Sequence, residues 1–446
     1  MFENIKSAYF IGIGGVSMSA LALLLLDKGI KVYGSDLRLS EVTRQLQQKG
    51  IDVVDGSAPH FVEECDICIV TGAVGEDNQD LILARKLGKK VYSRAELLGA
   101  LASEKKCISI AGTHGKTTTT GMLATIMLFA GLDPMIHVGG VLNEIGSNLH
   151  IGKGEYFLTE ACEYKDSFLS LKSDISVILN IEPDHLDYFK TVDNLQKSFE
   201  KFAKNTKKYG FLVKNSNIKG DLFKGLNVLS FGFDKRSIVQ AQNIREYEKA
   251  KYAYDLFVCD EFVGEVYLSA FGKHNVENSL AAIGVALLLD IDFKDIQKGL
   301  KEYKGVARRM DLVREKGPMI IHDYAHHPTE IESTIDACRR INKNLIVVFQ
   351  PHTFTRTRDL YEEFLSCFAK CSQVWLLPIY PAREKLIVNI SSKRLSDDLT
   401  KKGVKSRYFS SFDECKKAIL GYEQKYLFAI LGAGDIEELA QSLKKT

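Results

Sequence analysis

The chain has 446 residues, of which 45% are hydrophobic and 26% charged, and this balance is typical of a soluble globular protein. The formal net charge of +2 gives no electrostatic reason to expect binding to nucleic acid or to an anionic membrane. At about 150 residues per domain, the length predicts about three domains.

The N-terminus and the cysteines indicate a cellular compartment. "MFENIKSAYFIGIGG" lacks the basic flank, apolar core and cleavage site of a signal peptide, and no apolar run reaches the roughly 18 residues of a membrane helix. Nine scattered cysteines fit a reducing compartment better than a disulfide framework. Cys65 and Cys68 stand in the apolar "CDICIV" without a second pair to complete a zinc site, so we expect core thiols. These features predict a cytoplasmic protein.

The first hundred residues alternate short apolar strands with helical segments: "AYFIGIGG", residues 16–28, "KVYGSD", "DICIVTGA" and "KVYSR". This alternation predicts an α/β domain with a mostly parallel sheet. Gly12, Gly14 and Gly15 form a strand-to-helix turn in the outline of a dinucleotide-binding fold, but Ser17 stands where G-x-G-x-x-G has its last glycine. The turn favours a pyrophosphate over a nicotinamide cofactor, and a tight turn without any ligand is the alternative.

A second α/β pattern begins with "CISIAGTHGKTTTTG". A buried strand ends near Ala111, a glycine-bounded turn follows, and Lys116 and Thr117 open a helix that reaches about Ala130. Backbone N–H groups and the helix dipole attract phosphate there, Lys116 would reach the terminal phosphates, and the Thr117 hydroxyl can bind magnesium. Ile110 occupies the leading glycine position of G-x-x-x-x-G-K-[ST], so the cradle is shorter. A simple tight turn is the alternative, and a phosphate cradle alone fits a kinase, a switch protein, a transporter motor or a ligase.

Polar residues follow the next apolar segments. Glu160 ends one of them, and Asp184 and His185 follow the strand in "NIEPDHLDYF". Together with Thr117 they could complete a magnesium site, although Glu160 is equally well a solvated carboxylate and His185 alone is more often a structural hydrogen-bonding group. Alternating Val, Tyr and Phe over about 209–270 predict antiparallel strands.

The apolar helix that begins in "GKHNVENSLAA" has a polar start. Asn275 could cap this helix, whereas His274 and Asn278 could contact a base or a ribose.

The α/β pattern restarts once more at "GPMIIHDYAHHPTE". The strands in "NLIVVFQPH", "QVWLLPIY" and "LFAILGAGD" also end in polar residues, and ligands bind at the carboxyl ends of strands in open α/β sheets. The restarts predict three domains, 1–103, 104–311 and 312–446. Arg356 suits a carboxylate, and no third ligand is spaced to make the adjacent histidines a transition-metal site. The candidate residues at these strand ends are His322, His326, His327, His352, Arg356 and Arg358.

Nine segments, in order from about residue 9 to residue 436, together resemble the Mur ligases of bacterial cell-wall synthesis. They are "GIGGVSMSALA", "GTHGKTTTT", "EACEYKDSF", "NIEPDHLDYF", "GKHNVENSLAA", "GVARRMD", "DYAHHPTE", "FQPHTFTRTRD" and "LGAGDI". The resemblance implies an N-terminal Rossmann-like domain for a UDP-sugar, a central P-loop ATPase-like domain with a mostly parallel sheet, and a C-terminal Rossmann-like domain for an amino acid. The first turn and the histidine-rich segments point to the member that uses ATP and magnesium to join L-alanine to the lactyl carboxylate of UDP-N-acetylmuramate through an acyl phosphate.

The resemblance also implies site residues. Contact with ATP would come from Gly112, Thr113, His114, Gly115, Lys116, Thr117, Thr118, His274, Asn278 and Arg308. Magnesium ligands would be Thr117, Glu160 and His185. Contact with the UDP-sugar would come from Gly14, Gly15, Val16, Ser17, Ser35, Asp36 and Thr71. Contact with the amino acid would come from Tyr324, His326, His352 and Arg356. Catalytic roles would fall to Lys116, His185, Arg308, His326 and Arg356.

Two rival functions and two departures from the family pattern accompany this resemblance. One departure is Ser17, which replaces the glycine often found in the first turn and could donate to phosphate or cap the helix. The nearest rival is a murein tripeptide ligase acting on the same sugar nucleotide, and a rival of another class is a non-catalytic nucleotide-binding regulator. Several Mur ligases carry a carbamylated lysine after the metal-binding histidine, but the matching stretch here reads "QKSFEKF" and we assign no modified lysine. We expect small-molecule partners only, and a monomer or weak homodimer.

Overall fold

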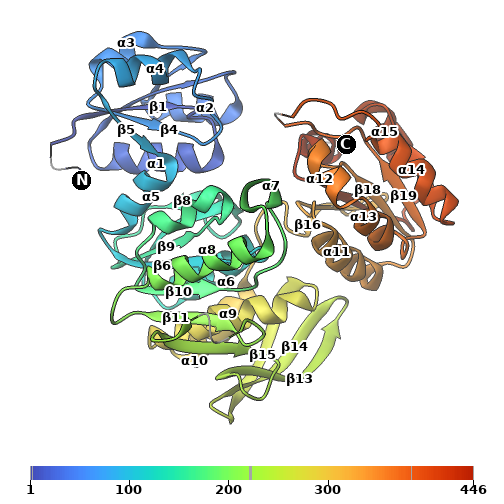
Figure 1. Ribbon diagram of the computed structural model, residues 1–446. Helices are drawn as coiled ribbons and strands as arrows, with labels where there is room; N and C mark the ends of the chain where they lie inside the picture. The colour runs from blue at the N-terminus through green and yellow to red at the C-terminus, as the bar shows by residue number, and fades with distance from the viewer. Residues whose placement is uncertain (1, 3, 220–222, 383, 445–446) are drawn as a thin grey trace. The chain divides into compact units, whose positions relative to one another are not determined.

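The computed structural model describes residues 2, 4–219, 223–382 and 384–444. It has three sheets, each built from its own stretch of the chain (Figure 1). The chain divides into two compact units, the first made of Met1–Ala241, Leu256–Val263 and Asn278–Glu302, and the second of Gln242–Asp255, Gly264–Glu277 and Tyr303–Thr446. Among the described residues, no helix is both long and apolar enough to span a membrane.

The first sheet has five parallel strands in the order β3-β2-β1-β4-β5. The strands are β1 (Ser7–Ile11), β2 (Lys31–Asp36), β3 (Asp52–Asp55), β4 (Ile67–Val70) and β5 (Lys90–Ser93). The helices are α1 (Val16–Asp27), α2 (Glu41–Gln48), α3 (Pro59–Glu64), α4 (Gln79–Lys86) and α5 (Arg94–Ala102). This confirms the predicted parallel α/β architecture. The strand order reverses next to β1, so the glycine turn after β1 lies at the switch point where ligands of such sheets bind.

The central strand β1 is buried on both faces. Tyr9 and Ile11 pack with α3 and α4, while Ala8 and Phe10 pack on the opposite face with α1 and α5. The alternation follows from the two-residue period of a strand. Cys65 and Cys68 are buried free thiols with their Sγ atoms 3.5 Å apart, which confirms the prediction of core thiols.

The central sheet has ten strands in the order β15-β14-β13-β12-β11-β10-β6-β9-β7-β8. The run from β13 to β7 is parallel, and β8 pairs antiparallel with β7. Its strands are β6 (Lys106–Ala111), β7 (Met135–Leu142), β8 (Ser147–His150), β9 (Tyr156–Glu160), β10 (Ile175–Ile178), β11 (Phe211–Asn215), β12 (Asn227–Gly232), β13 (Val239–Glu248), β14 (Lys251–Val258) and β15 (Glu261–Phe271). Its helices are α6 (Lys116–Phe129), η1 (Tyr164–Ser170), α7 (Leu186–Phe189), α8 (Val192–Lys204), α9 (His274–Leu288) and α10 (Phe293–Glu302). The mostly parallel sheet was predicted.

The prediction of antiparallel strands over 209–270 is wrong for β11 and β12. Both strands pair in parallel, β11 with β10 and β12 with β11. β12 also pairs in parallel with β13, whereas the two-residue link 249–250 between the neighbours β13 and β14 requires an antiparallel hairpin. The side-chain alternation in this stretch predicts strands but carries no information about their direction.

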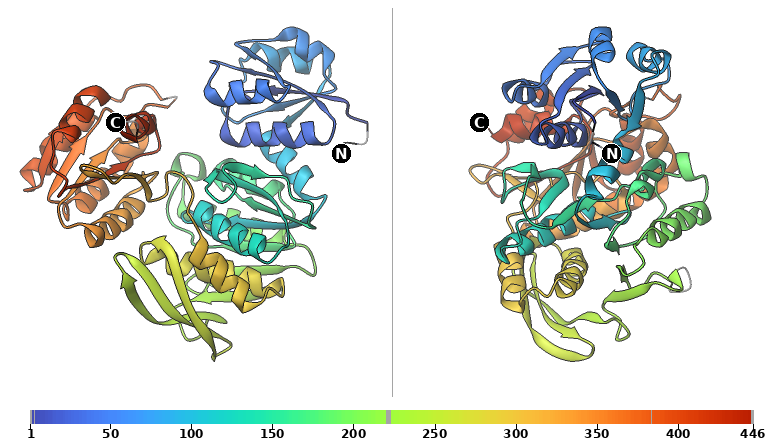
Figure 2. Two further views of the ribbon diagram at one scale, coloured as in Figure 1. Left: turned by 180° about the vertical axis from the view of Figure 1, so that it is seen from behind. Right: turned by 90° about the vertical axis from the view of Figure 1, so that its left-hand side faces the viewer.

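The third sheet has six strands in the order β16-β17-β21-β18-β19-β20, parallel except for β16. Helices cover both of its faces (Figure 2). Its strands are β16 (Asp311–Arg314), β17 (Met319–Asp323), β18 (Leu345–Phe349), β19 (Gln373–Leu376), β20 (Lys405–Tyr408) and β21 (Leu427–Leu431). Its helices are α11 (Pro328–Ile341), α12 (Phe354–Asp359), α13 (Tyr361–Phe368), α14 (Ser392–Lys401), α15 (Phe412–Leu420) and α16 (Ile436–Lys444). The predicted histidine-rich segments follow the carboxyl ends of β17 and β18.

Candidate active site

The first glycine turn is fixed to the end of β2. Gly12 has φ +83°, and its N–H donates to the Ser35 carbonyl at 2.8 Å. The N–H of Gly14 donates to Asp36 Oδ2 at 2.8 Å. A Cβ at Gly12 would lie 2.6 Å from Thr71 Cγ2. Ser35, Asp36 and Thr71 therefore surround the turn.

The start of α1 suits an anion. Gly15 precedes the helix without a side-chain cap, and the first turn carries no acidic residue, so its N–H groups and the helix dipole favour negative charge. Ser17, in this turn, has its Oγ 2.9 Å from His137 Nε2 and accepts a hydrogen bond from Arg94 at 3.2 Å. Sequence reasoning did not single out His137 or Arg94.

The second glycine turn has the geometry of a phosphate cradle. Gly112 and Gly115 have φ values of +150° and +84°, and α6 begins directly after Gly115. A Cβ at Gly115 would lie 2.4 Å from Asn278 Oδ1, and one at Gly112 would lie 2.9 Å from the Leu179 Cβ. Both positions therefore require glycine, and Asn278 of α9 lies beside the cradle.

Residues after β10 hold this cradle in place. The His114 N–H donates to Asn180 Oδ1 at 2.9 Å, and Asn180 Nδ2 donates back to the His114 carbonyl at 3.1 Å. The Thr113 hydroxyl donates to the Glu182 carbonyl at 3.1 Å and accepts from the Glu182 N–H at 2.9 Å. Asn180 is the first polar side chain after the buried strand β10, which is the signal that could have identified it.

Lys116 is a buried cation at the centre of the cradle. Its Nζ donates to the carbonyls of Gly112 at 2.5 Å and Thr113 at 3.1 Å, and it lies 2.9 Å from Glu163 Oε2. The exposed fractions of the Lys116 and Glu163 side chains are 17% and 3%. Burial lowers the pKa of Lys116, but the Glu163 carboxylate outweighs it and leaves this pKa above its usual value. Lys116 therefore stays charged, and Glu163 is a site residue that sequence reasoning missed.

The candidate metal ligands lie around this ion pair. Glu160 ends β9 and accepts a hydrogen bond from the Gly139 N–H at 2.5 Å. His185 has φ +53°, and its Nε2 lies 3.8 Å from Glu163 Oε1. Thr117, in the first turn of α6, is buried. Within the described ranges, no three His, Cys, Asp or Glu side chains are grouped as a ready-made metal site.

We expect Gly115→Ala to weaken ATP binding at least about tenfold, because its Cβ would displace Asn278 from the cradle. The left-handed φ adds a cost of about 1 to 2 kcal/mol to folding. Gly131→Ala is the matched control, because Gly131 has φ +72° with open space around its Cβ position. It should lower the melting temperature without changing ATP affinity. Equal ATP affinities of the two variants in calorimetry would contradict the cradle.

In the second unit, a buried carboxylate shapes the loop after β17. Asp323 accepts hydrogen bonds from the N–H groups of Met310 at 2.7 Å and Ala325 at 2.8 Å, and burial raises its pKa. Arg308 donates to Glu437 at 2.8 Å, and its guanidinium lies 5.1 Å from the centre of the Tyr324 ring. Arg308 is thus fixed next to the predicted amino-acid residues.

The four residues predicted to hold the amino acid come together. His326 Nδ1 donates to the Tyr324 carbonyl at 3.0 Å, and the His326 and His352 rings are 5.9 Å apart. Arg356 Nη1 lies 3.4 Å from His352 Nδ1. Burial lowers the pKa of His326 to about 3 and that of His352 to about 4, so both imidazoles are neutral at neutral pH.

Other predicted histidines and arginines lie elsewhere. Arg358 is half exposed and pairs with Asp359 at 2.7 Å, His322 is buried in β17, and His327 caps α11. His274 starts α9 four residues before Asn278 and is exposed.

Two residues of the second unit were missed by sequence reasoning. Tyr380 stacks on His352 with ring centres 5.6 Å apart, and Glu384 accepts from the Thr355 N–H at 2.9 Å, which fixes the start of α12.

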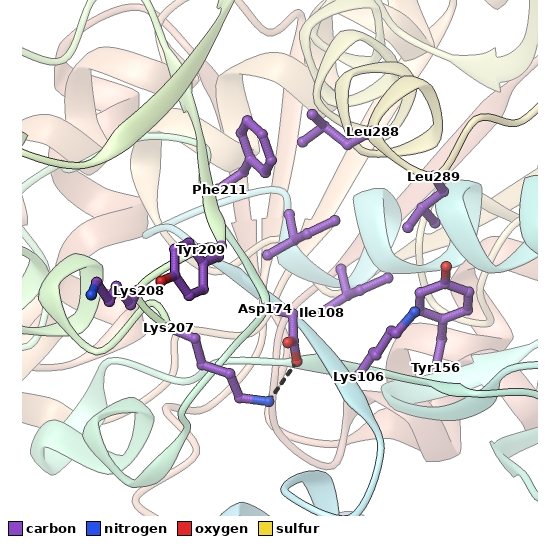
Figure 3. Close-up of a pocket in the computed structure, with 12 residues that line it drawn as sticks. Lys106, Ile108, Tyr156, Asp174, Lys207, Lys208, Tyr209, Phe211, Leu288 and Leu289 are labelled. Carbon is purple, nitrogen blue, oxygen red and sulfur yellow. Dashed lines mark hydrogen bonds and ion pairs between the residues drawn. The ribbon is translucent and has the colours of Figure 1, made fainter.

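A surface pocket lies at the opposite, amino-terminal ends of β6, β9, β10 and β11 (Figure 3). Its lining includes Lys106 and Lys207, which pair with Glu155 and Asp174, each at 2.8 Å. Lys106 is the first residue of β6, whereas the cradle follows the last residue of that strand. This pocket is therefore separate from the candidate active site.

Three family models match the chain in succession: the Mur ligase family, catalytic domain over residues 7–106, the Mur ligase middle domain over 110–286, and the Mur ligase, glutamate ligase domain over 308–434. The UDP-N-acetylmuramate–L-alanine ligase of Clostridium kluyveri is 42% identical over 99% of this chain and 98% of its own length. The crystal structure of UDP-N-acetylmuramate-alanine ligase from Thermotoga maritima has a TM-score of 0.85 at 26% identity and covers 98% of each chain. A murein peptide ligase from Psychrobacter arcticus shares the fold, with a TM-score of 0.74 at 23% identity over 99% of this chain and 98% of its own. With this identity over nearly its whole length, the chain belongs to the Mur ligase family.

Proposed function

We propose that the chain joins L-alanine to the lactyl carboxylate of UDP-N-acetylmuramate, with ATP hydrolysed to ADP and phosphate, in the cytoplasmic part of peptidoglycan synthesis. The observation that carries this proposal is the 42% identity, over 99% of the chain, to a protein named for this activity. The buried cation in a glycine cradle and the separate cluster of Arg356 with two neutral histidines supply the chemistry that such a reaction needs. We assign 1–103 to the UDP-sugar, 104–311 to ATP and 312–446 to the amino acid.

The first step transfers the γ-phosphoryl group of ATP to a carboxylate oxygen. Both reactants are anions, so the step needs fixed positive charge where negative charge develops. Lys116 and the N–H groups of residues 112–118 supply it. In the structure, Lys116 Nζ bonds the carbonyls of Gly112 and Thr113, and phosphate oxygens take over these bonds when ATP binds. Asn278 and His274 face the nucleotide, and Arg308 its phosphates.

A magnesium site beside the cradle fits the side chains present. Thr117 and Glu160 offer the oxygen ligands that magnesium prefers, and His185 adds a nitrogen. The Gly139 N–H fixes one oxygen of Glu160, and Glu163 brings a second buried carboxylate next to His185. When bound, magnesium supplies charge neutralisation between the phosphates.

In the second step the amine of alanine attacks the acyl phosphate, and phosphate leaves as the amide forms. Arg356 binds the alanine carboxylate, while Tyr324 and His352 position the amino acid. Because His326 Nδ1–H donates a hydrogen bond to the Tyr324 carbonyl and the ring is neutral, His326 Nε2 is left as a hydrogen-bond acceptor that orients the amine. The pyrophosphate of the sugar nucleotide is held by the turn of Gly14, Gly15, Val16 and Ser17. Its uridine side is held by Ser35, Asp36 and Thr71.

The test is phosphate release from ATP in the presence of UDP-N-acetylmuramate. We expect turnover with L-alanine, and none when either the amino acid or the sugar nucleotide is omitted. The tripeptide L-alanyl-γ-D-glutamyl-meso-diaminopimelate should be at least about a hundredfold poorer, since its C-terminal carboxylate lies too far from the reacting amine for Arg356 to bind it as it would bind that of alanine. Turnover with the tripeptide alone would identify a peptide-recycling enzyme, and no phosphate release with any acceptor would favour a nucleotide-binding regulator.

A further inference from the structure

A buried chain of hydrogen bonds connects the first glycine turn to the strand that carries Glu160. Ser17 Oγ lies 2.9 Å from His137 Nε2, and His137 Nδ1 lies 3.0 Å from Thr159 Oγ1. The Thr159 hydroxyl in turn donates to the Glu160 carbonyl at 3.1 Å. His137 is 4% exposed and Thr159 is fully buried, so water does not compete for the bond between them, whereas the Ser17 end of the chain is part-buried.

The direction of the bonds in this chain follows from its Thr159 end. The Thr159 hydrogen goes to the Glu160 carbonyl, so Thr159 Oγ1 accepts from His137 Nδ1. The Thr159 end therefore places a proton on His137 Nδ1. In a neutral ring Nε2 then carries none, so it accepts the Ser17 hydrogen, while Ser17 Oγ accepts from Arg94.

The surroundings of His137 favour a neutral ring. Burial, and then the charge of Arg94, lower its pKa to about 3. With a charged form excluded, the ring has only two states in ordinary conditions, a proton on Nδ1 or a proton on Nε2.

Binding of an anion at the start of α1 would compete for the Ser17 hydrogen. Ser17 lies in the first turn of α1, which has no side-chain cap and no acidic residue and which, under the proposed function, holds the pyrophosphate of the sugar nucleotide. A phosphate oxygen is a stronger acceptor than a neutral imidazole nitrogen, because a charged partner roughly doubles the strength of a hydrogen bond.

We propose that His137 is a positioning residue whose tautomer changes when the sugar nucleotide binds at the turn after β1. This change alters the hydrogen bonding of Glu160. When Ser17 turns its hydrogen to the pyrophosphate, His137 exchanges its Nδ1 proton for one on Nε2 and donates to Ser17. Nδ1 then accepts from Thr159, whose hydroxyl leaves the Glu160 carbonyl. The imidazole holds one proton throughout, and Ser17, His137 and Thr159 each keep a partner, while the Glu160 carbonyl loses the Thr159 hydroxyl.

This inference rests on the proposed function, since it needs the pyrophosphate at α1. Its consequence is that the hydrogen bonding of the main-chain carbonyl of Glu160, the proposed magnesium ligand, differs between the free and the sugar-bound protein. The hydrogen-bonded residues belong to the parts of the protein that form the first and the central sheets. Strand β7 carries both His137 and Gly139, and the Gly139 N–H donates to the Glu160 carboxylate.

Nitrogen NMR of the protein labelled with 15N-histidine tests the proposal directly, because two-bond proton–nitrogen correlations distinguish the two tautomers. The chain has ten histidines, and His137→Gln assigns the signal by its loss. We expect a proton on Nδ1 in the free protein and on Nε2 at saturating UDP-N-acetylmuramate. Calorimetry on the same sample separates the outcomes: no binding of UDP-N-acetylmuramate ends the proposed function, whereas binding with an unchanged tautomer ends this inference alone.

A pair of threonine variants checks the consequence for catalysis. Thr159→Val removes the hydroxyl in the chain and should lower kcat about fivefold while the Kd for UDP-N-acetylmuramate changes less than twofold. Thr125→Val is the matched control, because Thr125 is also buried and its hydroxyl donates only to the Gly121 carbonyl within α6, at 2.9 Å. Equal values of kcat in the two variants would show that the chain has only a structural role.

Discussion

Replacing Lys116 with methionine should lower kcat about a thousandfold and leave the affinity for UDP-N-acetylmuramate nearly unchanged. The loss is large because Lys116 Nζ is the buried cation that faces the phosphates, and removing one preorganised donor from such a site costs about 10² to 10³ in rate. The sugar nucleotide is unaffected because its proposed turn after β1 belongs to a different sheet. Phosphate release and calorimetry measure the two quantities.

The same substitution should also destabilise the fold, and a second variant separates this effect from catalysis. The Glu163 carboxylate is 3% exposed and loses its cationic partner when Lys116 is replaced. Breaking a buried ion pair in this way lowers the free energy of unfolding by about 3 to 5 kcal/mol. Adding Glu163→Gln removes the stranded charge, so the double variant should regain most of the melting temperature and none of the activity. Recovery of activity would mean that Lys116 only balances the charge of Glu163.

Lys105→Met provides the matched control for this experiment. Lys105 also donates to two main-chain carbonyls, those of Gly152 and Gly154, but it stands just before the amino end of β6, far from the cradle. Its loss should change kcat less than about twofold. A thousandfold fall in both variants would attribute the effect to general disruption of the sheet.

The cradle could be predicted from the sequence because it is local. A strand, a glycine turn and a helix follow one another in "CISIAGTHGKTT", and each residue type has a geometric reason to be there. Asn180 and Glu163 could not be found in this way. They contact residues 66 and 47 positions away, and they flank β6 only because the sheet order is β10-β6-β9, which no local pattern specifies.

The second unit shows a similar division. The polar ends of β17 and β18 predict that His326, His352 and Arg356 meet, since parallel strands in one sheet present their carboxyl ends on the same edge. The prediction included Arg358 with them. Residues two apart on a helix point about 200° apart, however, and in the structure Arg356 contacts His352 while Arg358 is half exposed. Helical geometry alone could have separated these two arginines. Tyr380 lies beyond β19, and its stacking on His352 depends on the tertiary fold.

Arg356→Ala should raise the KM for L-alanine about 10- to 150-fold, the range that corresponds to the 1.5 to 3 kcal/mol of a hydrogen bond to a charged group. Nothing in ATP or sugar-nucleotide binding requires this side chain, so the affinities for both should stay within about twofold. Arg356→Lys should recover only part of the loss, because an ammonium keeps the charge but cannot bind a carboxylate through two parallel N–H groups.

Arg358→Ala is the internal comparison for Arg356. It removes the same side chain from the same helix, α12, but this guanidinium pairs with Asp359 and is half exposed, so the KM for L-alanine should not change. Initial rates of phosphate release at varied L-alanine give the three KM values. An unchanged KM in Arg356→Ala would contradict the proposed role of Arg356 in binding the amino acid. An equal rise of KM in both alanine variants would attribute the effect to the loss of positive charge in general. A rise confined to Arg356, with kcat partly retained at saturating L-alanine, would mean that the guanidinium recognises the carboxylate of the incoming amino acid.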